Sequence, residues 1–467
     1  MTYYYASSTT PGVYGGVSGF PDDEGTPMNT LQDENPAACR AMALEHMRRQ
    51  ELDSAEECFA RLLGMLPDDV QALRFLAARH FARREHGRAI ELLQAADRLK
   101  RDDPSILGQL GAVQLDAADF GAAAASLRRG LELAPQMFVA RLQLGIALEQ
   151  SGQAHEALMA YFTAVRSAQL QGRWLNDETT APVLRDAVKY AMRYANDGRH
   201  QLFRGVLEPL RERYGSSELV RVEHCLAIYF AEQPANIPDS RQLPKFLYFP
   251  DVPSQPYYPR ERFPWLDALE AATATVRDEL LAVLAQEQEL EAFLGQQSAR
   301  DLQDWLRASG NRQAAWDAYF FYRHGNRYDE HCARCPQTTA LLDAMPLVRI
   351  RDHAPETLFS VLRPGTHILP HRGVTNTRLV THLPLIIPAD CAIRVGGEDH
   401  AWQEGRCVTF DDTFEHEAWN DSDETRVVLI FDSWNPDLSE AERAAVTDLV
   451  EAIGDFNQAC ELPAVTA

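Results

Sequence analysis

Two histidines and one arginine in the C-terminal third of the chain have types and spacing suited to metal chemistry. His371 follows a proline at the end of a strand-like segment, and His416 begins another such segment 45 residues later. Arg426 lies ten residues beyond His416, inside the apolar segment TRVVLIF. Imidazole suits Fe(II), and non-haem oxygenases hold this metal through facial ligand sets with open positions. 2-Oxoglutarate would chelate the metal, and the planar guanidinium of Arg426 could hold its distal carboxylate.

Each of these residues also has an ordinary structural explanation. A strand histidine is most often a satisfied core or surface residue, and an arginine in an apolar strand can occupy a solvent-facing position. Eight cysteines are scattered along the chain, and only Cys332 and Cys335 form a C-x-x-C pair. A structural zinc site would need a second pair or suitably spaced histidines nearby. We therefore expect reduced thiols, which are typical of cytoplasmic proteins.

The elements that must position these residues are short and rich in β-branched and aromatic side chains. Turn signals such as RPGT, IPAD, GGED and NDSDE separate them. The segments are TLFSVLR, THILPH, TRLVTHLPLII, CAIRVGG, RCVTFDD, HEAWN and TRVVLIFDSW. Short strands at this spacing predict a β-sandwich or barrel, with the jelly roll as one candidate. Helical patterning over residues 262–310 precedes them.

Several of these segments carry a family resemblance. HRGVTNTRLVTHLPLIIP and WQEGRCVTFDDTFEHEAWNDSDETRVVLIFDSWNPDLS resemble the aspartyl/asparaginyl β-hydroxylase family, as do WDAYFFYRHG and CPQTTALLDAMP. The resemblance covers roughly residues 300–445. It implies a double-stranded β-helix, the jelly roll of Fe(II)- and 2-oxoglutarate-dependent dioxygenases. Tetratricopeptide repeats preceding this domain also recur in the family.

The same resemblance implies a role for seven residues. His371 and His416 resemble the iron ligands. Ser360 and Arg426 resemble the groups that hold the distal carboxylate of 2-oxoglutarate, and His382 resembles a neighbour of that co-substrate. Arg378 and Arg307 resemble cations that face the carboxylate of the substrate.

Two positions depart from what related oxygenases carry. The usual carboxylate ligand would follow the first histidine by two residues, and that position is Gly373. The β-hydroxylase family is similar in using two histidines. Asp411 and Asp412 precede His416, and we interpret them as turn residues or as groups that orient this histidine. Val380 stands where the family often has a second arginine, which makes the expected pocket less basic.

An internal repeat of 34 residues runs through the N-terminal half of the chain. Three sets of positions keep this step: alanines, a set of small residues, and a set of larger apolar residues. They are Ala55, Ala89, Ala123 and Ala157; Ala43, Ala77, Gly111 and Gly145; and Phe59, Leu93, Leu127 and Tyr161. This period predicts four tetratricopeptide repeats over residues 36–170. Pro67, Pro104 and Pro135 are expected to end the second helix of a unit.

The predicted fold class is therefore multidomain, with an all-α tetratricopeptide-repeat solenoid followed by a double-stranded β-helix (jelly-roll) domain with flanking helices. Residues 1–35 are rich in Gly, Ser, Thr, Pro and Asp, and we expect a disordered leader. Residues 171–240 keep helical periodicity and then become rich in proline, which indicates a helical cap and connector. The β-hydroxylase-like domain would cover residues 241–467.

Composition restricts the expected partners. The formal net charge of −23 argues against binding to nucleic acid, which needs concentrated Lys and Arg, and against docking on an anionic membrane. No apolar stretch is long enough to suggest a membrane span. The N-terminal residues lack the pattern of a signal peptide. We therefore expect a cytoplasmic protein.

The resemblance implies hydroxylation at the β-carbon of an Asp- or Asn-type residue in a peptide or protein, with Fe(II), 2-oxoglutarate and O2. The repeats could bind that peptide or another partner, and a spacer or dimerisation role is the alternative. Two other functions stay open. One is the same chemistry on a small, carrier-bound or lipid substrate, and the other is a non-catalytic repeat scaffold. The joint presence of His371, His416, Ser360 and Arg426 favours an enzyme.

Overall fold

The computed structural model describes residues 35–286, 290–295, 303–309 and 312–461. The predicted leader lies outside the described residues, apart from Asn35. The chain divides into two compact units, one formed by residues 1–199 with 456–467 and the other by residues 200–455. Each unit is described separately below. Within the described residues, no helix is both long and apolar enough to cross a membrane.

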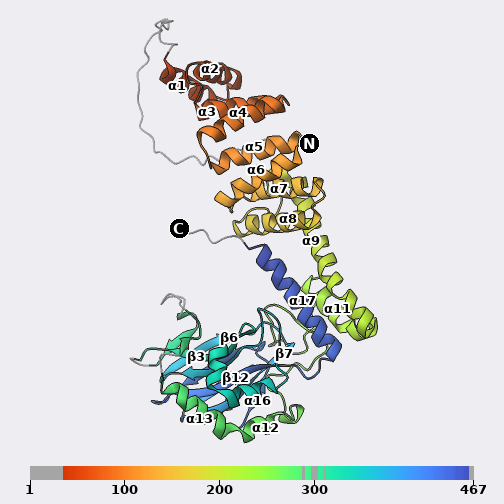
Figure 1. Ribbon diagram of the computed structural model, residues 1–467, viewed down its shortest axis with the longest axis vertical. Coiled ribbons are helices and arrows are strands. Elements are labelled where there is room, and N and C mark those ends of the chain that lie inside the picture. The colour runs from red at the N-terminus through yellow and green to blue at the C-terminus, as the bar shows by residue number, and fades with distance from the viewer. Residues whose placement is uncertain (1–34, 287–289, 296–302, 310–311, 462–467) are drawn as a thin grey trace. The chain divides into compact units, whose positions relative to one another are not determined.

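The first unit is built from antiparallel helix pairs (Figure 1). Its repeat helices are α1 (Pro36–Arg48), α2 (Leu52–Met65), α3 (Val70–Ala82), α4 (His86–Leu99), α5 (Pro104–Asp116), α6 (Phe120–Leu133), α7 (Phe138–Gln150) and α8 (Ala154–Leu170). The prediction of a helical repeat array is confirmed. Ala55, Ala89, Ala123 and Ala157 are fully buried.

The glycines of the repeat lie where two helices approach closely. A Cβ at Gly111 would lie 2.5 Å from Leu127, and one at Gly145 would lie 2.6 Å from Tyr161. Only a glycine avoids these overlaps without a shift of the neighbouring helix. One expectation about the prolines is wrong. Pro104 does not end a helix but is the first residue of α5, where its missing N–H leaves no helical hydrogen bond unmade.

Further helices follow the repeats. They are η1 (Pro182–Leu184), α9 (Arg185–Val206), α10 (Glu208–Tyr214), η2 (Ser216–Leu219) and α11 (Val220–Tyr229). The first part of α9 packs on α8, because a Cβ at Gly198 would lie 2.7 Å from Leu158. The rings of Tyr161 and Tyr194 also lie 5.1 Å apart. These contacts cover apolar surface of the last repeat, as a cap must.

The second unit contains two antiparallel sheets. Its strands are β1 (Glu291–Ala292), β2 (Leu306–Ala308), β3 (Trp316–Arg323), β4 (Asn326–Arg327), β5 (Thr357–Leu362), β6 (Thr366–His371), β7 (Arg378–Ile386), β8 (Cys391–Val395), β9 (Glu398–Ala401), β10 (Val408–Phe410), β11 (His416–Asn420) and β12 (Arg426–Trp434). The large sheet has the order β1-β3-β5-β12-β7-β10, with β4 beside β3, and the small sheet has the order β2-β6-β11-β8-β9.

The last eight strands pair in a nested way. β5 pairs with β12, β6 with β11, β7 with β10, and β8 with β9. This nesting is consistent with the jelly-roll arrangement expected from the sequence. It brings segments that lie far apart along the chain, such as the ends of β6 and β11, into direct register.

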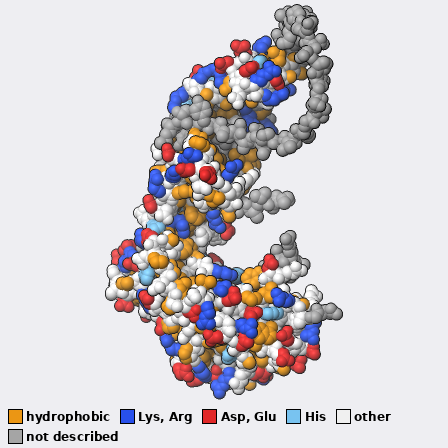
Figure 2. Space-filling view, turned by 180° about the vertical axis from the view of Figure 1, so that it is seen from behind, with side chains coloured by type: hydrophobic (Ala, Val, Ile, Leu, Met, Phe, Trp, Pro, Cys, Tyr) orange, Lys and Arg blue, Asp and Glu red, His pale blue; other side chains and the backbone are white. Residues whose placement is uncertain are grey.

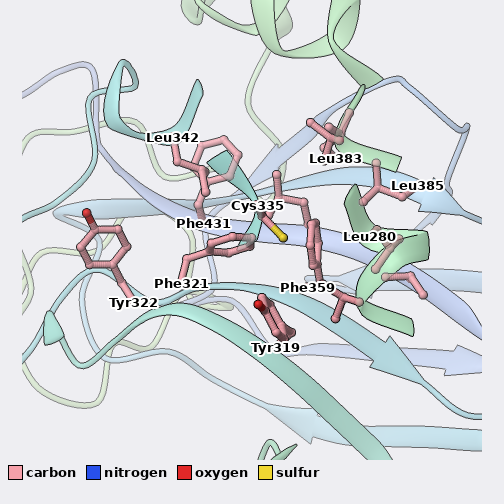
Figure 3. Close-up of a cluster of buried hydrophobic side chains, with 14 of the residues drawn as sticks. Leu280, Tyr319, Phe321, Tyr322, Cys335, Leu342, Phe359, Leu383, Leu385 and Phe431 are labelled. Carbon is pink, nitrogen blue, oxygen red and sulfur yellow. The ribbon is translucent and has the colours of Figure 1, made fainter. Parts of the chain in front are cut away.

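Helices cover the outer face of the large sheet. They are α12 (Leu266–Ala271), α13 (Thr273–Leu284), α15 (Asp329–Arg334) and α16 (Pro336–Asp343). The short η3 (Arg260–Arg262) precedes them in the chain, and α17 (Glu440–Ala459) follows the last strand. Figure 3 shows the apolar core on this face, in which Leu280 and Leu342 pack against Phe359, Leu383 and Phe431. Cys332 and Cys335 are buried in the same core, so packing accounts for the C-x-x-C pair.

A second apolar core lies between the two sheets. Large-sheet residues such as Leu362, Val380 and Val428 meet small-sheet residues such as Ile368 and Ile393. In the view of Figure 2, acidic and basic side chains are interspersed over the surface. Most of the predicted site residues point into this inter-sheet space, and Arg307 is the exception described below.

Candidate metal and co-substrate site

Strand alternation directs the predicted site residues into the space between the sheets. On β12, Val427 and Leu429 belong to the outer core, so Arg426 and Val428 face inward. By the same alternation Ser360 on β5 and His382 on β7 face inward. Their cross-strand partners on β12 are Val428 and Ile430, which lie on the same face.

His371 and His416 meet at the adjacent ends of β6 and β11. They are direct register partners, and the pairing contains a bulge before Ala418. His416 alternates with Ala418, which packs in the inter-sheet core, so the His416 side chain also points inward. The centroids of the two imidazole rings are 4.1 Å apart. The structure therefore brings together the two predicted iron ligands.

Both imidazoles bond to a backbone carbonyl through the same ring nitrogen. The Nδ1 atom of His371 lies 2.8 Å from the carbonyl oxygen of Leu369, and that of His416 lies 3.1 Å from the carbonyl oxygen of Phe414. A carbonyl only accepts, so Nδ1 carries the proton and Nε2 keeps its lone pair. Backbone carbonyls commonly fix metal-binding histidines in this way.

Burial keeps both histidines neutral. It lowers the pKa of His371 to about 4, and the neighbouring His416 lowers it further. Burial likewise lowers the pKa of His416 to about 4. Neutral imidazole is the form that ligates a divalent metal, so both side chains are in this form at neutral pH.

Asp412 lies beside the position where related oxygenases carry a carboxylate ligand. A Cβ on Gly373 would overlap the Asp412 carboxylate, and the Gly373 N–H donates to the Asp412 carbonyl at 2.6 Å. The Oδ1 atom of Asp412 is buried and has no hydrogen-bond partner within the described chain. Burial raises the pKa of this carboxyl group, while Arg378 opposes the rise.

The adjacent Asp411 has a different role. Its Oδ1 accepts from the N–H and the hydroxyl of Thr413 at 2.9 and 2.5 Å, and its Oδ2 accepts from Gln242 at 2.6 Å. Asp411 is thus a turn residue, whereas Asp412 faces the region of the two histidines. Among the described residues, no three His, Cys, Asp or Glu side chains form a group that could hold a metal. A metal at His371 and His416 would take its remaining ligands from small molecules.

A buried cation without an acid partner lies deeper in the inter-sheet space. Arg426 is 1% exposed, and its Nη1 donates to the hydroxyl and carbonyl oxygens of Ser360 at 3.3 Å. Its guanidinium stacks 4.8 Å from the ring of Trp402. Its Nε has no hydrogen-bond partner, and no carboxylate pairs with it in the part of the chain that the structure describes. Burial lowers its pKa to about 10, so it stays charged.

This arrangement fits an anionic ligand. A buried charge without a partner is costly, and a bound carboxylate would pair with Arg426. His382 lies on the same side, and its buried Nδ1 also lacks a partner in the described residues. The ring of Phe410 is 5.0 Å from His382 and 5.6 Å from His416. Phe410 therefore links the region of Ser360, His382 and Arg426 to the histidine pair, and the co-substrate role of these three residues stays a prediction.

Arg378 is also inward-facing and is largely buried, with 15% of its side chain exposed, but its charge is already balanced. It forms ion pairs with Asp432 and, at 3.6 Å, with Asp412. Burial alone would lower its pKa, but the negative charges of Asp432 and Asp412 raise the pKa instead. The predicted role of Arg378 toward a substrate carboxylate stays a prediction, and these two acids would compete with that carboxylate.

The structure does not place Arg307 with the other predicted residues. Leu306 packs against the inter-sheet core, so the next residue on β2 points to the opposite face. The cross-strand partner of Arg307 is His367, which bonds Glu417 at 2.8 Å on that outer face. Sequence similarity did not indicate this direction, because a shift of one residue reverses the face.

One residue beside the histidines was missed. The segment 242–247, at the start of the expected β-hydroxylase-like domain, runs along the loops after His371 and before His416. The Lys245 N–H donates to the carbonyl of Gly373 at 3.2 Å. Proline and aromatic residues around it favoured an irregular linker. The one available signal was the rarity of lysine, since Lys100, Lys189 and Lys245 are the only lysines in the chain.

Comparison with known proteins shows which family this chain belongs to. Residues 270–436 match the family model described as aspartyl/asparaginyl beta-hydroxylase. The chain is 32% identical over 265 residues to the rat aspartate beta-hydroxylase domain-containing protein 2, covering 56% of this chain and 73% of that protein. The chain belongs to the aspartyl/asparaginyl β-hydroxylase family. The matched region contains both histidines, Ser360, His382 and Arg426.

Two other relatives of this hydroxylase-family chain have names that refer to different substrates. The human aspartyl/asparaginyl beta-hydroxylase is 35% identical over 180 residues, which are 38% of this chain and 22% of that protein. The ornithine lipid ester-linked acyl 2-hydroxylase of Rhizobium tropici is 34% identical over 198 residues, which are 42% of this chain and 66% of that protein. Both are hydroxylases by name, and one is named for a lipid acyl group.

Proposed function

We propose that this family member is an Fe(II)- and 2-oxoglutarate-dependent dioxygenase that hydroxylates the β-carbon of an Asp- or Asn-type residue in a peptide or protein. The observation that carries the proposal is a pair of neutral histidines whose Nδ1 atoms bond to backbone carbonyls, in the same inter-sheet space as a buried arginine that lacks an acid partner in the described chain. These two features are the ones that a metal chelated by a dicarboxylate would use.

The roles of the chain's own residues follow from their geometry. His371 and His416 would hold iron through Nε2, and their Nδ1–H bonds to carbonyls fix the ring orientations. Arg426, with Ser360, would hold the distal carboxylate of 2-oxoglutarate. When bound, iron would supply the activation of O2 for a reaction in which 2-oxoglutarate, O2 and a substrate C–H give succinate, CO2 and C–OH.

The pocket walls would exclude water from this chemistry. The ring of Phe410 packs against His416, and the ring of Trp305 lies 5.6 Å from His371. Trp402 covers the Arg426 guanidinium. Apolar walls strengthen the attraction between Arg426 and a carboxylate, because the local dielectric is low. Asp412, whose buried Oδ1 has no partner within the described chain, would offer a polar group to a ligand bound near the histidine pair.

A second function keeps the oxygenase chemistry and changes the substrate to a small, carrier-bound or lipid acyl compound. The similarity to the ornithine lipid hydroxylase supports it. So do the exposed apolar side chains of Leu243 and Val374 next to the histidine loops, which are 49% and 42% exposed. Mass spectrometry of an aspartyl peptide and of a hydroxylatable acyl compound, each incubated with the full chain, would distinguish the two substrates.

The helical repeats would serve the first function by binding the peptide or protein substrate. In repeat arrays an extended concave surface is the usual binding region. A spacer role predicts instead that a peptide substrate binds the second unit alone. Substitutions on the repeat surface would then leave the KM for the peptide unchanged.

Anaerobic binding tests the proposal directly. Adding 2-oxoglutarate to the iron-loaded full chain should produce the visible absorption band of an iron–2-oxoglutarate chelate. The band should be absent from His416→Ala, because one ligand is lost. In Arg426→Gln it should require much more 2-oxoglutarate. Absence of the band from the wild-type protein would reject the proposed chemistry.

A further inference from the structure

Lysine is rare in this protein, and the three lysines differ in their surroundings. The chain has 45 basic residues, of which only Lys100, Lys189 and Lys245 are lysines. Lys100 pairs with Asp103 at 2.7 Å and Lys189 pairs with Asp177 at 2.9 Å. Lys245 makes no ion pair with any residue that the structure describes. It is thus the one lysine whose charge no folded-state contact explains.

The backbone around Lys245 is held against both histidine loops. Four backbone contacts fix it. Gln242 forms a β-bridge with Phe414, and Leu247 forms one with Thr375. Between them, the Leu243 N–H donates to the Thr413 carbonyl at 3.0 Å and the Lys245 N–H donates to the Gly373 carbonyl at 3.2 Å. Gly373 follows His371 by two residues, and Phe414 precedes His416 by two. Gln242 and Leu247 are both buried. The segment 242–247 is therefore a fixed strap beside the metal site.

The Lys245 side chain extends from this strap into solvent. Its backbone N–H is held by the carbonyl of Gly373, two residues after His371. The long stem of a lysine in this place lets its ammonium group reach the mouth of the histidine site while staying in contact with water.

The other cations near the site are already engaged. Arg378 pairs with Asp432 and Asp412, and Arg372 pairs with Glu415 at 2.9 Å. Arg307 lies on the opposite face of the small sheet, and position 380 is a valine. If Arg426 binds the co-substrate, Lys245 is the remaining charge that could meet an anionic group on the substrate.

We infer that Lys245 binds the carboxylate of the substrate and makes the site select aspartyl over asparaginyl residues. This inference rests on the proposed function and adds the substrate class to it. A lysine ammonium gains a charge-assisted bond from a carboxylate but only a neutral hydrogen bond from an amide. The exposed Leu243 and Val374 flank the strap contacts and would touch the adjacent atoms of the peptide.

The scarcity of lysine makes a direct binding experiment practical. Reductive methylation with 13C-formaldehyde labels the three lysines and the α-amino group of the full chain and keeps their charge. The Lys245 signal is assigned by its loss in Lys245→Arg. With Zn2+ and 2-oxoglutarate present, the labelled protein is titrated with the α-amide of N-acetyl-aspartate, the α-amide of N-acetyl-asparagine, or octanoate. No turnover is needed.

We expect a saturable shift of the Lys245 signal with the aspartyl amide, at about tenfold lower concentration than with the asparaginyl amide, as one charge-assisted contact allows. The Lys100 and Lys189 signals should not move. Unlabelled Lys245→Gln, followed by calorimetry, should lose the tenfold preference, and Lys245→Arg should keep most of it. Lys100→Gln, a matched change in the repeats, should bind like wild type.

Three results would overturn the inference. They are a Lys245 signal that does not respond to the aspartyl amide, a Lys245→Gln variant that keeps the preference, and tighter binding of octanoate than of the aspartyl amide. Failure of the proposed function would appear separately. In that case the iron-loaded wild-type chain would not bind 2-oxoglutarate, whatever the lysine signals do.

Discussion

The carboxylate of Asp412 occupies the space that a side chain at Gly373 would need. In oxygenases with a complete facial triad, a carboxylate follows the first histidine by two residues. Here the chain carries glycine at that position. The adjacent space is filled by Asp412, which lies in the segment that leads into β11 and His416. A side chain at position 373 and the Asp412 carboxylate therefore cannot occupy the same space. Exchanging the two residue types tests this relationship.

Gly373→Asp alone should not create a third metal ligand, because the new Cβ overlaps Asp412. We expect weaker iron binding and a loss of about 1–3 kcal/mol in the free energy of unfolding, the usual cost of overpacking. The double variant Gly373→Asp/Asp412→Gly should recover part of both losses. Urea unfolding and metal titration measure them. Equal losses in the single and double variants would contradict the overlap.

Arg426→Met separates ligand binding from folding. Because the guanidinium is buried without an acid partner, its removal should leave the ligand-free protein as stable as wild type or more stable. The affinity for 2-oxoglutarate should fall by about 100-fold, the order expected when one member of a buried charge pair is lost. Thermal unfolding and calorimetry give the two values. A large loss of stability in the ligand-free variant would show that Arg426 is mainly structural.

Arg378 should behave in the opposite way. Arg378→Met leaves Asp432 and Asp412 buried without their cation, so we expect a loss of about 3–5 kcal/mol in the free energy of unfolding. Arg378→Met/Asp432→Leu should recover part of it, since one buried charge is removed along with its partner. If Arg378→Met folds with unchanged stability but loses substrate binding, the substrate role implied by the family resemblance is correct.

The lowered pKa values of the two histidines predict a pH dependence of stability. A histidine near pKa 4 in the folded state and near 6.5 unfolded takes up its proton first in the unfolded chain. Its contribution is therefore complete above about pH 6.5 and is lost as the pH falls toward 4. Buried Asp411, whose pKa burial raises to about 7, acts in the opposite direction.

Comparing His416→Gln with wild type isolates the contribution of His416 to the pH dependence of stability. The free energy of unfolding of metal-free His416→Gln, measured by urea at several pH values, should fall less between pH 6.5 and 4.5 than that of wild type. His224→Gln, a histidine away from the site, serves as the control and should follow wild type. Parallel curves for wild type and His416→Gln would mean that His416 titrates normally in the folded protein.

The sequence predicts the structure best where a residue pattern recurs at a fixed spacing or where chemically matched residue types occur together. The 34-residue step of Ala55, Ala89 and their successors reports a packing requirement that every repeat shares. His371 and His416 could be selected because strand-like segments ending and beginning in histidine suit a two-ligand site. These features depend on local pattern, and the structure brings the two histidines together.

The direction in which a side chain points, and the residues that it contacts, could not be predicted in the same way. Arg307 faces away from the site because Leu306 takes the inward position on β2, and register is not visible in one strand's sequence. Asp411 and Asp412 differ by one position, yet one closes a turn and the other lies against Gly373 near the histidine pair. Lys245 comes from a proline-rich segment whose strap position depends on hydrogen bonds to Gly373 and Thr413, over a hundred residues away in the chain.

Succinate formation tests the central claim most directly. The full chain is incubated with Fe(II), O2, 2-oxoglutarate and an aspartyl peptide, and wild type is compared with His416→Ala and with the control His224→Gln. We predict iron-dependent succinate from wild type and His224→Gln, and none above background from His416→Ala. A wild-type protein that forms no succinate, and that fails to bind 2-oxoglutarate when loaded with iron, would contradict the account of this chain as an Fe(II)- and 2-oxoglutarate-dependent dioxygenase.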